Sequence, residues 1–177
     1  IIWCVVGLLV VFSLDYYEQK NKMRFGLLGK DIDYSFSRAY FAEKFKKEAL
    51  DHCSYQNFDL PDLTDFKTVL QTPQLKGMNV TIPYKQEVMP FLDNLDEVSK
   101  AIGAVNTIVF NSDGTTTGYN TDYIGFQKSI IPMITAEINA ALVLGTGGAS
   151  KAVVYALHKM GIKTQYISRK KGLNNLT

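Results

Sequence analysis

The chain has 177 residues, 46% hydrophobic and 20% charged, which is the composition of an ordinary soluble globular protein and excludes a disordered one. Its 19 basic and 17 acidic residues leave a formal net charge of +2, too small a positive field to indicate nucleic-acid binding. A small-molecule ligand is therefore expected.

Residues 1–12 are continuously apolar, but they are fewer than the roughly 20 residues that span a bilayer. No basic segment precedes them as a signal peptide requires. Two interpretations are open: a remnant of a membrane helix, which would tether the protein, or an extraneous or leader segment at 1–22. The second is favoured because residues 23–29 resemble a first strand ending in glycine, so no membrane association is expected.

From Phe25 onward, short apolar runs alternate with helical stretches, a pattern typical of α/β architecture. The first elements expected are a strand at 25–28, a helix capped by Ser37, a strand at 55–59, a helix at 63–70 and a strand-like segment at 75–81. Pro83 suits the first position of a helix, where its missing N–H is not needed. Lys85 is therefore expected in a first helical turn.

The later elements include a hairpin and one βαβ unit. Strands at 104–110 and 115–118 flank a turn at 111–114, and a helix at 123–131 begins at Thr121 or Asp122. The βαβ unit comprises a strand at 141–144, suited to burial on both faces, a helix at 150–160 stopped by Gly161, and a strand at 164–168.

The turn at 145–150, Gly-Thr-Gly-Gly-Ala-Ser, lets backbone N–H groups approach a pyrophosphate at a helix N-terminus. Ser150 replaces the third glycine of the usual dinucleotide fingerprint, so the motif alone is weak. Ser168-Arg-Lys-Lys171 begins 21 positions after Gly147 (168 − 147) and contains no acid, which favours NADP with Arg169 at the 2′-phosphate. The alternative is a solvated charge run.

Lys85 and Asp122 each follow a strand-like segment and are predicted to meet in a cleft. When hydride adds to a ketone, negative charge develops on oxygen, and a positioned ammonium that gives up a proton there lowers the barrier. The order of these motifs suggests an enzyme that transfers hydride. The alternatives are a solvated lysine and a carboxylate that merely starts a helix.

Other polar side chains stand where loops begin. Hydroxyls and amides at strand ends bind ligands more often than those within elements, but they also stabilise turns, and both roles stay open here. The residues are Ser35, Ser37, Asn79, Thr81, Asn106 and Thr121.

The cysteines and histidines indicate neither a metal site nor a disulfide scaffold. Cys4 and Cys53 lack ligand spacing, and a secreted disulfide protein would carry a denser pattern. His52 and His158 have no cysteine or carboxylate partner at ligand spacing, so structural or surface roles are predicted. No metal is assigned, and a cytoplasmic location is expected.

Taken together, the motifs resemble those of the shikimate dehydrogenase family. The matching segments occur in family order and are 34–37, 77–85, 101–107, 118–122, 145–150 and 167–169. The resemblance implies an N-terminal α/β substrate-binding domain followed by the first βαβ unit of a Rossmann-like NADP-binding domain. It also implies reversible NADPH-dependent reduction of 3-dehydroshikimate to shikimate in chorismate and aromatic amino-acid biosynthesis.

The family's site residues carry over to matching positions here. Lys85 and Asp122 would be the catalytic pair. The implied substrate-binding residues are Ser35, Ser37, Asn79, Thr81, Asn106, Thr121 and Asp122. The implied cofactor-binding residues are Gly145, Gly147, Gly148, Ala149, Ser150, Ser168, Arg169 and Lys170.

The chain departs from the family in two ways. Tyr34 and Arg38 replace a histidine and a proline beside the serines, and Ser168 and Lys170 replace an asparagine and a threonine around the retained arginine. The chain also ends at Thr177, where family members continue, so a sequence truncated within the nucleotide-binding domain is expected. Residues left partly in water by that ending would be Leu142, Val143, Leu144, Tyr166 and Ile167.

The predicted domain organisation is a leader at 1–22, a substrate-binding catalytic domain at 23–121, a connecting helix and linker at 122–139, and an incomplete NADP-binding domain at 140–177. Two functional alternatives stay open: an NAD-preferring quinate/shikimate dehydrogenase and a shikimate-binding chain without catalysis. A monomer or homodimer is expected.

Overall fold

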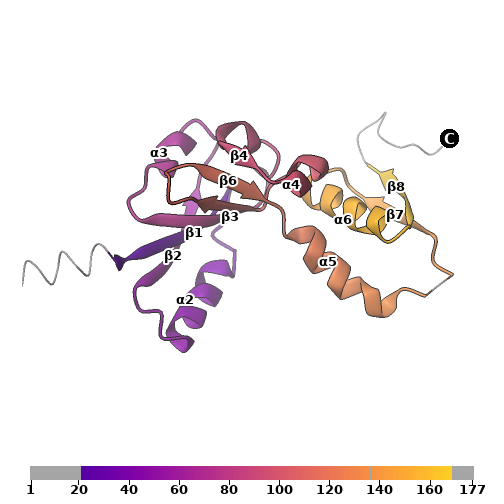
Figure 1. Cartoon of the computed structure of the whole chain (residues 1–177), viewed down its shortest axis with the longest axis horizontal. Helices are drawn as coiled ribbons and strands as arrows, with labels where there is room; N and C mark the ends of the chain where they lie inside the picture. The colour runs from indigo at the N-terminus through magenta and orange to yellow at the C-terminus, as the bar shows by residue number, and fades with distance from the viewer. Residues whose placement is uncertain (1–20, 136, 169–177) are drawn as a thin grey trace, which may run out of the picture. The chain divides into compact units, whose positions relative to one another are not determined.

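A computed structural model describes residues 21–135 and 137–168 of the chain (Figure 1). Helices and strands alternate, so the predicted α/β class is confirmed. The chain divides into two compact units, one ending at Met78 and one beginning at Asn79. The domain boundaries predicted at 121 and 139 stay predictions.

The first unit is built on three neighbouring strands in the order β2-β1-β3. β1 (Met23–Gly29) and β2 (Cys53–Asp59) run parallel, with Met23 opposite Cys53 and Gly29 opposite Asp59. β3 (Leu75–Val80) crosses into the second unit. All three strands were predicted, β1 and β2 each with fewer residues.

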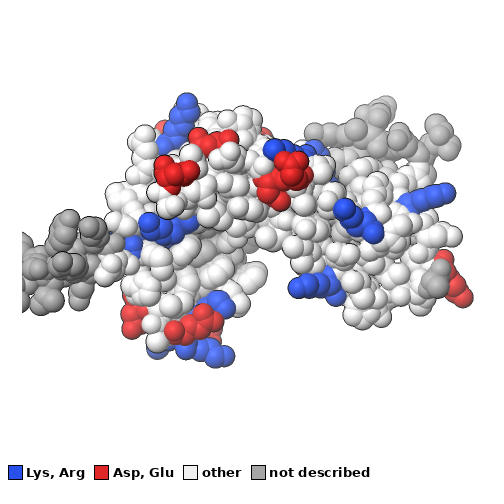
Figure 2. All heavy atoms as spheres, viewed as in Figure 1, with Lys and Arg blue, Asp and Glu red and all other residues white. Residues whose placement is uncertain are grey.

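Two helices accompany these strands. α2 (Ser37–Lys47) packs on β2 through a stacked Phe41–Tyr55 pair whose ring centroids are 4.4 Å apart. Its outer surface is polar, and Figure 2 shows acidic and basic side chains together over α2, where Lys44 and Glu48 form an ion pair. α3 (Phe66–Leu70) begins three residues later than predicted, because the Phe66 N–H closes a turn onto the Leu63 carbonyl.

After β3, the second unit continues with turns and not with the helix predicted at Pro83. Residues 82–88 form turns that lead to a short 3₁₀ helix, η1 (Met89–Phe91). The reason is non-local: the Val105 N–H donates to the Lys85 carbonyl at 2.7 Å, so that carbonyl is taken by another segment, and the Met89 N–H bonds to Gln86 instead. Lys85 therefore does not lie in a helical turn, and that prediction is wrong.

The predicted hairpin is present. β5 (Thr107–Phe110) and β6 (Thr116–Tyr119) pair antiparallel, with Thr107 opposite Tyr119, and β4 (Asn94–Leu95) pairs parallel with β6. α4 (Glu97–Ile102) is capped by the Asp96 carboxylate, which accepts from the Ser99 and Val98 N–H groups. α5 (Asp122–Ile130) follows β6 as predicted, and the short 3₁₀ helix η2 (Ile131–Met133) comes directly after it.

The predicted βαβ unit is confirmed. β7 (Ala140–Leu144) and β8 (Lys163–Ile167) run parallel and are joined by α6 (Gly148–Lys159), which ends before Gly161 at a φ of +76°. Figure 1 shows α6 lying against the two strands.

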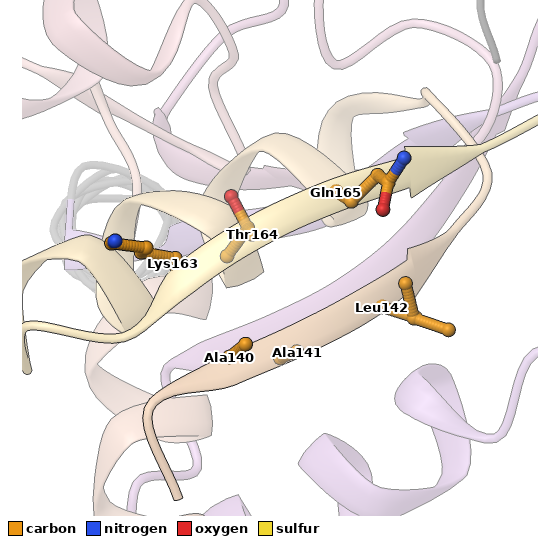
Figure 3. Close-up of a pocket in the computed structure, with 6 residues that line it drawn as sticks. All are labelled: Ala140, Ala141, Leu142, Lys163, Thr164 and Gln165. Carbon is orange, nitrogen blue, oxygen red and sulfur yellow. The ribbon is translucent and has the colours of Figure 1, made fainter. Parts of the chain in front are cut away.

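Within residues 21–135 and 137–168, the two faces of β7 differ in burial. Val143 is 6% exposed and packs with Leu157 and Ile162, so its predicted exposure is wrong, because α6 covers it. Leu142 and Leu144 are 62% and 77% exposed, as predicted. Tyr166 and Ile167 are partly buried, also as predicted. Residues 140–142 of β7 and 163–165 of β8 line a pocket (Figure 3).

Asp93 ties the start of β4 to β6 and predicts a pH dependence of stability. The Thr116 backbone N–H and hydroxyl both donate to Asp93 Oδ2 at 2.8 Å, and these bonds hold the pKa of Asp93 below its usual value. A carboxyl whose pKa is lower in the folded state stabilises that state above its unfolded pKa, and the effect is lost as pH falls through the folded pKa. The Asp93→Ala variant should therefore lose less of its free energy of unfolding between about pH 5 and about pH 2 than the wild type does, as measured by urea unfolding at each pH. Parallel curves would contradict this assignment.

Across residues 21–135 and 137–168, no helix combines the length and the apolar character needed to cross a bilayer.

Candidate active site

Lys85 and Asp122 form an ion pair within the second unit. Lys85 Nζ lies 2.6 Å from Asp122 Oδ2, and the two side chains are 16% and 32% exposed. A charge-assisted hydrogen bond of this length between partly buried groups is stronger than a surface pair. The predicted meeting of the two residues is therefore observed, although they reach it from a turn and a helix start and not from two helices.

Asn106 binds the other oxygen of the Asp122 carboxylate. Its Nδ2 donates to Asp122 Oδ1 at 2.7 Å and to Thr121 Oγ1 at 2.9 Å, while its Oδ1 accepts from the Thr121 N–H at 2.9 Å. The Thr107 hydroxyl also donates to Asn106 Oδ1, at 3.0 Å. Asn106 is 8% exposed, so this network fixes the orientation of the carboxylate beside Lys85. The predicted residues Asn106 and Thr121 are thus brought together with the pair.

Asn120 belongs to the same network and was missed from sequence. It is 4% exposed, accepts from the Asp122 N–H at 3.0 Å and donates to the Ala104 carbonyl at 2.9 Å. In the run 118–122 it resembled an ordinary turn residue. The partner that distinguishes it lies 16 residues earlier, and no local pattern signals that contact.

The glycine turn comes into direct contact with the catalytic candidate. A β-carbon built on Gly148 would lie 2.8 Å from Lys85 Cβ, closer than real β-carbons approach, and 3.3 Å from Ala104 Cβ, a tight contact. Gly148 is therefore required for the close approach of the Lys85 segment. The glycine turn therefore lies beside Lys85.

The same turn suits a pyrophosphate. Gly147 is the N-cap of α6 and offers no capping side chain, and a β-carbon there would meet no atom within 4 Å. Gly145 has a φ of +98°, a left-handed conformation that favours glycine. Ala149 and Ser150 lie in the first turn of α6, where N–H groups are not yet bonded within the helix. This backbone fits a dinucleotide's phosphates.

The predicted adenosine-side residues are only partly described. Ser168 follows β8 and is half-buried. Arg169 and Lys170 lie outside the described residues. Cys4, which was predicted to have no metal-binding role, also lies outside them.

Ser35 and Ser37 lie together in the first unit, in the loop between β1 and α2. Their hydroxyl oxygens are 3.1 Å apart, and both residues are half-buried. The cap predicted at Ser37 is wrong, because Ser37 is the first helical residue and its N–H donates to Ser35 Oγ at 3.3 Å. Asp59 holds the preceding loop by accepting the Asp31 and Ile32 N–H groups, each at 2.9 Å.

The two remaining candidates for substrate binding, Asn79 and Thr81, lie near the end of β3. Asn79 is half-buried within β3, and Thr81 is the first residue after that strand, where its carbonyl accepts from the Tyr84 N–H at 3.0 Å. Within the described part of the chain, no group of His, Cys, Asp or Glu side chains has the arrangement of a metal site. His158 Nε2 contacts Thr164 Oγ1 at 2.8 Å.

Comparisons with known proteins agree on one family. Residues 27–108 match the family described as the shikimate dehydrogenase substrate binding domain. The NADP(+) shikimate dehydrogenase of Aquifex aeolicus is 38% identical over 150 residues, covering 83% of this chain and 55% of the relative. A crystal structure of shikimate dehydrogenase from A. aeolicus has a TM-score of 0.76 at 37% identity, covering 85% of this chain and 57% of that one.

Two further solved structures carry ligands. Shikimate 5-dehydrogenase from Thermus thermophilus, in complex with NADP(H) and shikimate, has a TM-score of 0.73 at 32% identity and covers 84% of this chain and 56% of that one. Quinate dehydrogenase from Corynebacterium glutamicum, in complex with NAD, has a TM-score of 0.72 at 33% identity and covers 83% and 55%.

The chain spans about half the length of the curated relatives it matches. The predicted resemblance to the shikimate dehydrogenase family is therefore confirmed, and residues 27–108 of this chain match that family's substrate-binding domain.

Proposed function

We propose that this chain carries the catalytic centre of an NADP-dependent shikimate dehydrogenase, which reversibly reduces 3-dehydroshikimate to shikimate. The observation that carries the proposal is the 2.6 Å pair of Lys85 and Asp122 packed directly against the glycine turn at Gly148. A cation beside a dinucleotide-binding turn is what ketone reduction requires, because hydride arrives from one side while charge develops on the oxygen.

The proposed chemistry follows from the pair. The backbone of the glycine turn would hold NADPH, whose chemistry there would be transfer of a hydride to the substrate's carbonyl carbon with formation of NADP+. As the C=O bond becomes C–O, the Lys85 ammonium donates one proton to the oxygen and then regains a proton from solvent. Asp122 holds the ammonium in place with one oxygen, while Asn106 fixes the other. The reverse reaction uses the same groups with the amine as base.

The remaining substrate contacts are proposed from the resemblance. Ser35 and Ser37 would hold the substrate carboxylate, and Thr81, Asn106 and Asp122 its ring hydroxyls. Asn79 and Thr121 would support them. Residues 23–121 would form the substrate-binding domain, and residues from 140 onward the start of the NADP-binding domain. A cytoplasmic location and a monomeric or homodimeric state complete the proposal.

Cofactor choice supplies a test. The proposed phosphate cradle is the backbone of Gly145, Gly147, Gly148, Ala149 and Ser150, with Ser168, Arg169 and Lys170 on the adenosine side. Because a 2′-phosphate pairs well with a guanidinium, Arg169→Ala should raise the KM for NADP+ about tenfold or more and leave the KM for NAD+ within about twofold. Steady-state rates with each cofactor measure both values. Equal loss with both cofactors would contradict the role of Arg169.

The second candidate is an NAD-preferring quinate/shikimate dehydrogenase, favoured by the similarity to a quinate dehydrogenase bound to NAD. Rates with shikimate and quinate, each with both cofactors, separate the two. A higher kcat/KM for quinate and NAD+ than for shikimate and NADP+ would favour this candidate.

A third candidate is a shikimate-binding chain without turnover, favoured by the match of residues 27–108 to a substrate-binding domain. Calorimetric titration with shikimate and with NADPH separately, together with an assay of NADPH formation from shikimate and NADP+, decides among them. Binding of both ligands with turnover supports the proposed function. Shikimate binding with no NADPH binding and no turnover would support the third candidate instead.

A further inference from the structure

Asn120 joins two backbone segments through a buried side-chain amide. Its Oδ1 accepts from the Asp122 N–H at 3.0 Å, and its Nδ2 donates to the Ala104 carbonyl at 2.9 Å. Backbone N–H and C=O groups can only donate and only accept, so the orientation of this amide is fixed by its partners. No shape-equivalent side chain other than an amide offers both an acceptor and a donor at these places.

The segment that Asn120 reaches, residues 104–106, also contacts both members of the ion pair. We call this segment the strap. The Val105 N–H donates to the Lys85 carbonyl at 2.7 Å, and Asn106 Nδ2 donates to Asp122 Oδ1 at 2.7 Å. Ala104 and Val105 have no exposed surface, so the strap has little room to shift. Its position therefore sets where the Lys85 backbone and the Asp122 carboxylate stand.

The glycine turn rests on the same strap. A β-carbon on Gly148 would overlap the β-carbon of Lys85 at 2.8 Å and would press tightly against that of Ala104 at 3.3 Å. Asn120 thus ties the start of α5 to a segment that contacts the lysine, the aspartate and the glycine turn.

We propose that Asn120 is a positioning residue of this site: by tying Asp122 to the strap, it sets the separation of the Lys85 ammonium from the Asp122 carboxylate. The consequence for catalysis rests on the proposed function, whereas the effect on the pair does not. Removing the amide leaves the Ala104 carbonyl buried without this donor, and the strap relaxes toward another one. That shift displaces the Val105 N–H, which binds the Lys85 carbonyl, and it thereby weakens the pairing of Lys85 with Asp122.

Two variants separate the two hydrogen bonds of Asn120. Asn120→Ala removes both. Asn120→Ser keeps an oxygen able to accept from the N–H two residues on, as serine does in turns, but is too short to reach the Ala104 carbonyl. Asn111→Ala is the matched control, because Asn111 also donates two side-chain hydrogen bonds, to Thr115 and Thr117 in the hairpin, and neither touches the pair.

The test measures the pair directly, without requiring turnover. Trace acetylation of the folded chain, followed by mass spectrometry, gives the rate at which the Lys85 amine reacts relative to the exposed Lys128 of α5. In the wild type we expect slow acetylation of Lys85, because its amine is paired with Asp122 and its side chain is 16% exposed. We expect both Asn120 variants to raise the Lys85/Lys128 ratio by roughly fivefold, the size typical of breaking one member of a coupled network. Asn111→Ala should leave the ratio unchanged.

An unchanged ratio in folded Asn120→Ser would overturn the proposal, whatever Asn120→Ala does. If Asn120→Ala fails to fold by circular dichroism, the serine variant alone decides. A lower melting temperature with an unchanged ratio would mean that Asn120 only caps α5. Where the chain turns over shikimate, kcat of Asn120→Ser should fall while the KM for shikimate stays within about twofold. A raised ratio in a chain without turnover would support the positioning role and contradict only the proposed function.

Discussion

Lys85→Met is expected to lower kcat for shikimate oxidation by about 10³-fold while changing the dissociation constant of shikimate only a few-fold. The substitution removes the proton donor and the positive charge at the developing oxyanion. It keeps an unbranched aliphatic stem, so the packing of the Lys85 β-carbon against Gly148 is preserved. Asp122, 32% exposed, stays partly hydrated when its partner is lost.

The measurement is steady-state turnover combined with calorimetric titration of shikimate. Lys128→Met is the matched control, since Lys128 is an exposed lysine of the same unit, and its kcat should equal that of the wild type. A Lys85→Met enzyme that keeps kcat within tenfold of wild type would remove Lys85 from the chemistry.

Gly148→Ala is expected to destabilise the chain by about 1–3 kcal/mol, the usual cost of overpacking. The added β-carbon would lie 2.8 Å from Lys85 Cβ and 3.3 Å from Ala104 Cβ. β-carbons are fixed to the backbone and cannot rotate away, so either α6 or the Lys85 segment must move. Turnover should fall as well, because the movement disturbs the pair.

Gly147→Ala is the matched control for this experiment. Its β-carbon would meet no atom within 4 Å, and Gly147 has a φ of −77°, which alanine adopts freely. Urea unfolding without cofactor should therefore give Gly147→Ala nearly wild-type stability. Equal stabilities of the two variants would show that the turn and the Lys85 segment do not press together in solution.

Local signals explain which parts of the fold sequence reasoning predicted. The turn at 111–114 between β-branched runs predicts the β5–β6 hairpin, and Gly161 predicts the end of α6, because each depends on neighbouring residues alone. The helix predicted at Pro83 failed for the opposite reason. The carbonyl of Lys85 accepts from Val105, a partner 20 residues away (105 − 85), and local propensity cannot anticipate such competition.

The site residues divide in the same way, into those with a local sequence signal and those whose role depends on distant contacts. The pairing of Lys85 with Asp122 was predicted from their places after strands and is observed at 2.6 Å. The role of Asn120 was invisible, because an asparagine before a helix is typical of turns and its distinguishing partner is a distant carbonyl. The contact between Gly148 and Lys85 has no local signal in the sequence. Its closeness depends on how α6 packs, which sequence spacing does not encode.

A crystal structure of this chain with bound shikimate tests the central claim most directly. The account predicts one ring hydroxyl within about 3 Å of both Lys85 Nζ and an Asp122 carboxylate oxygen, with Asn106 still bound to that carboxylate. Shikimate bound with its hydroxyls away from both residues, or an Asp122 carboxylate turned away from the Lys85 ammonium, would contradict it.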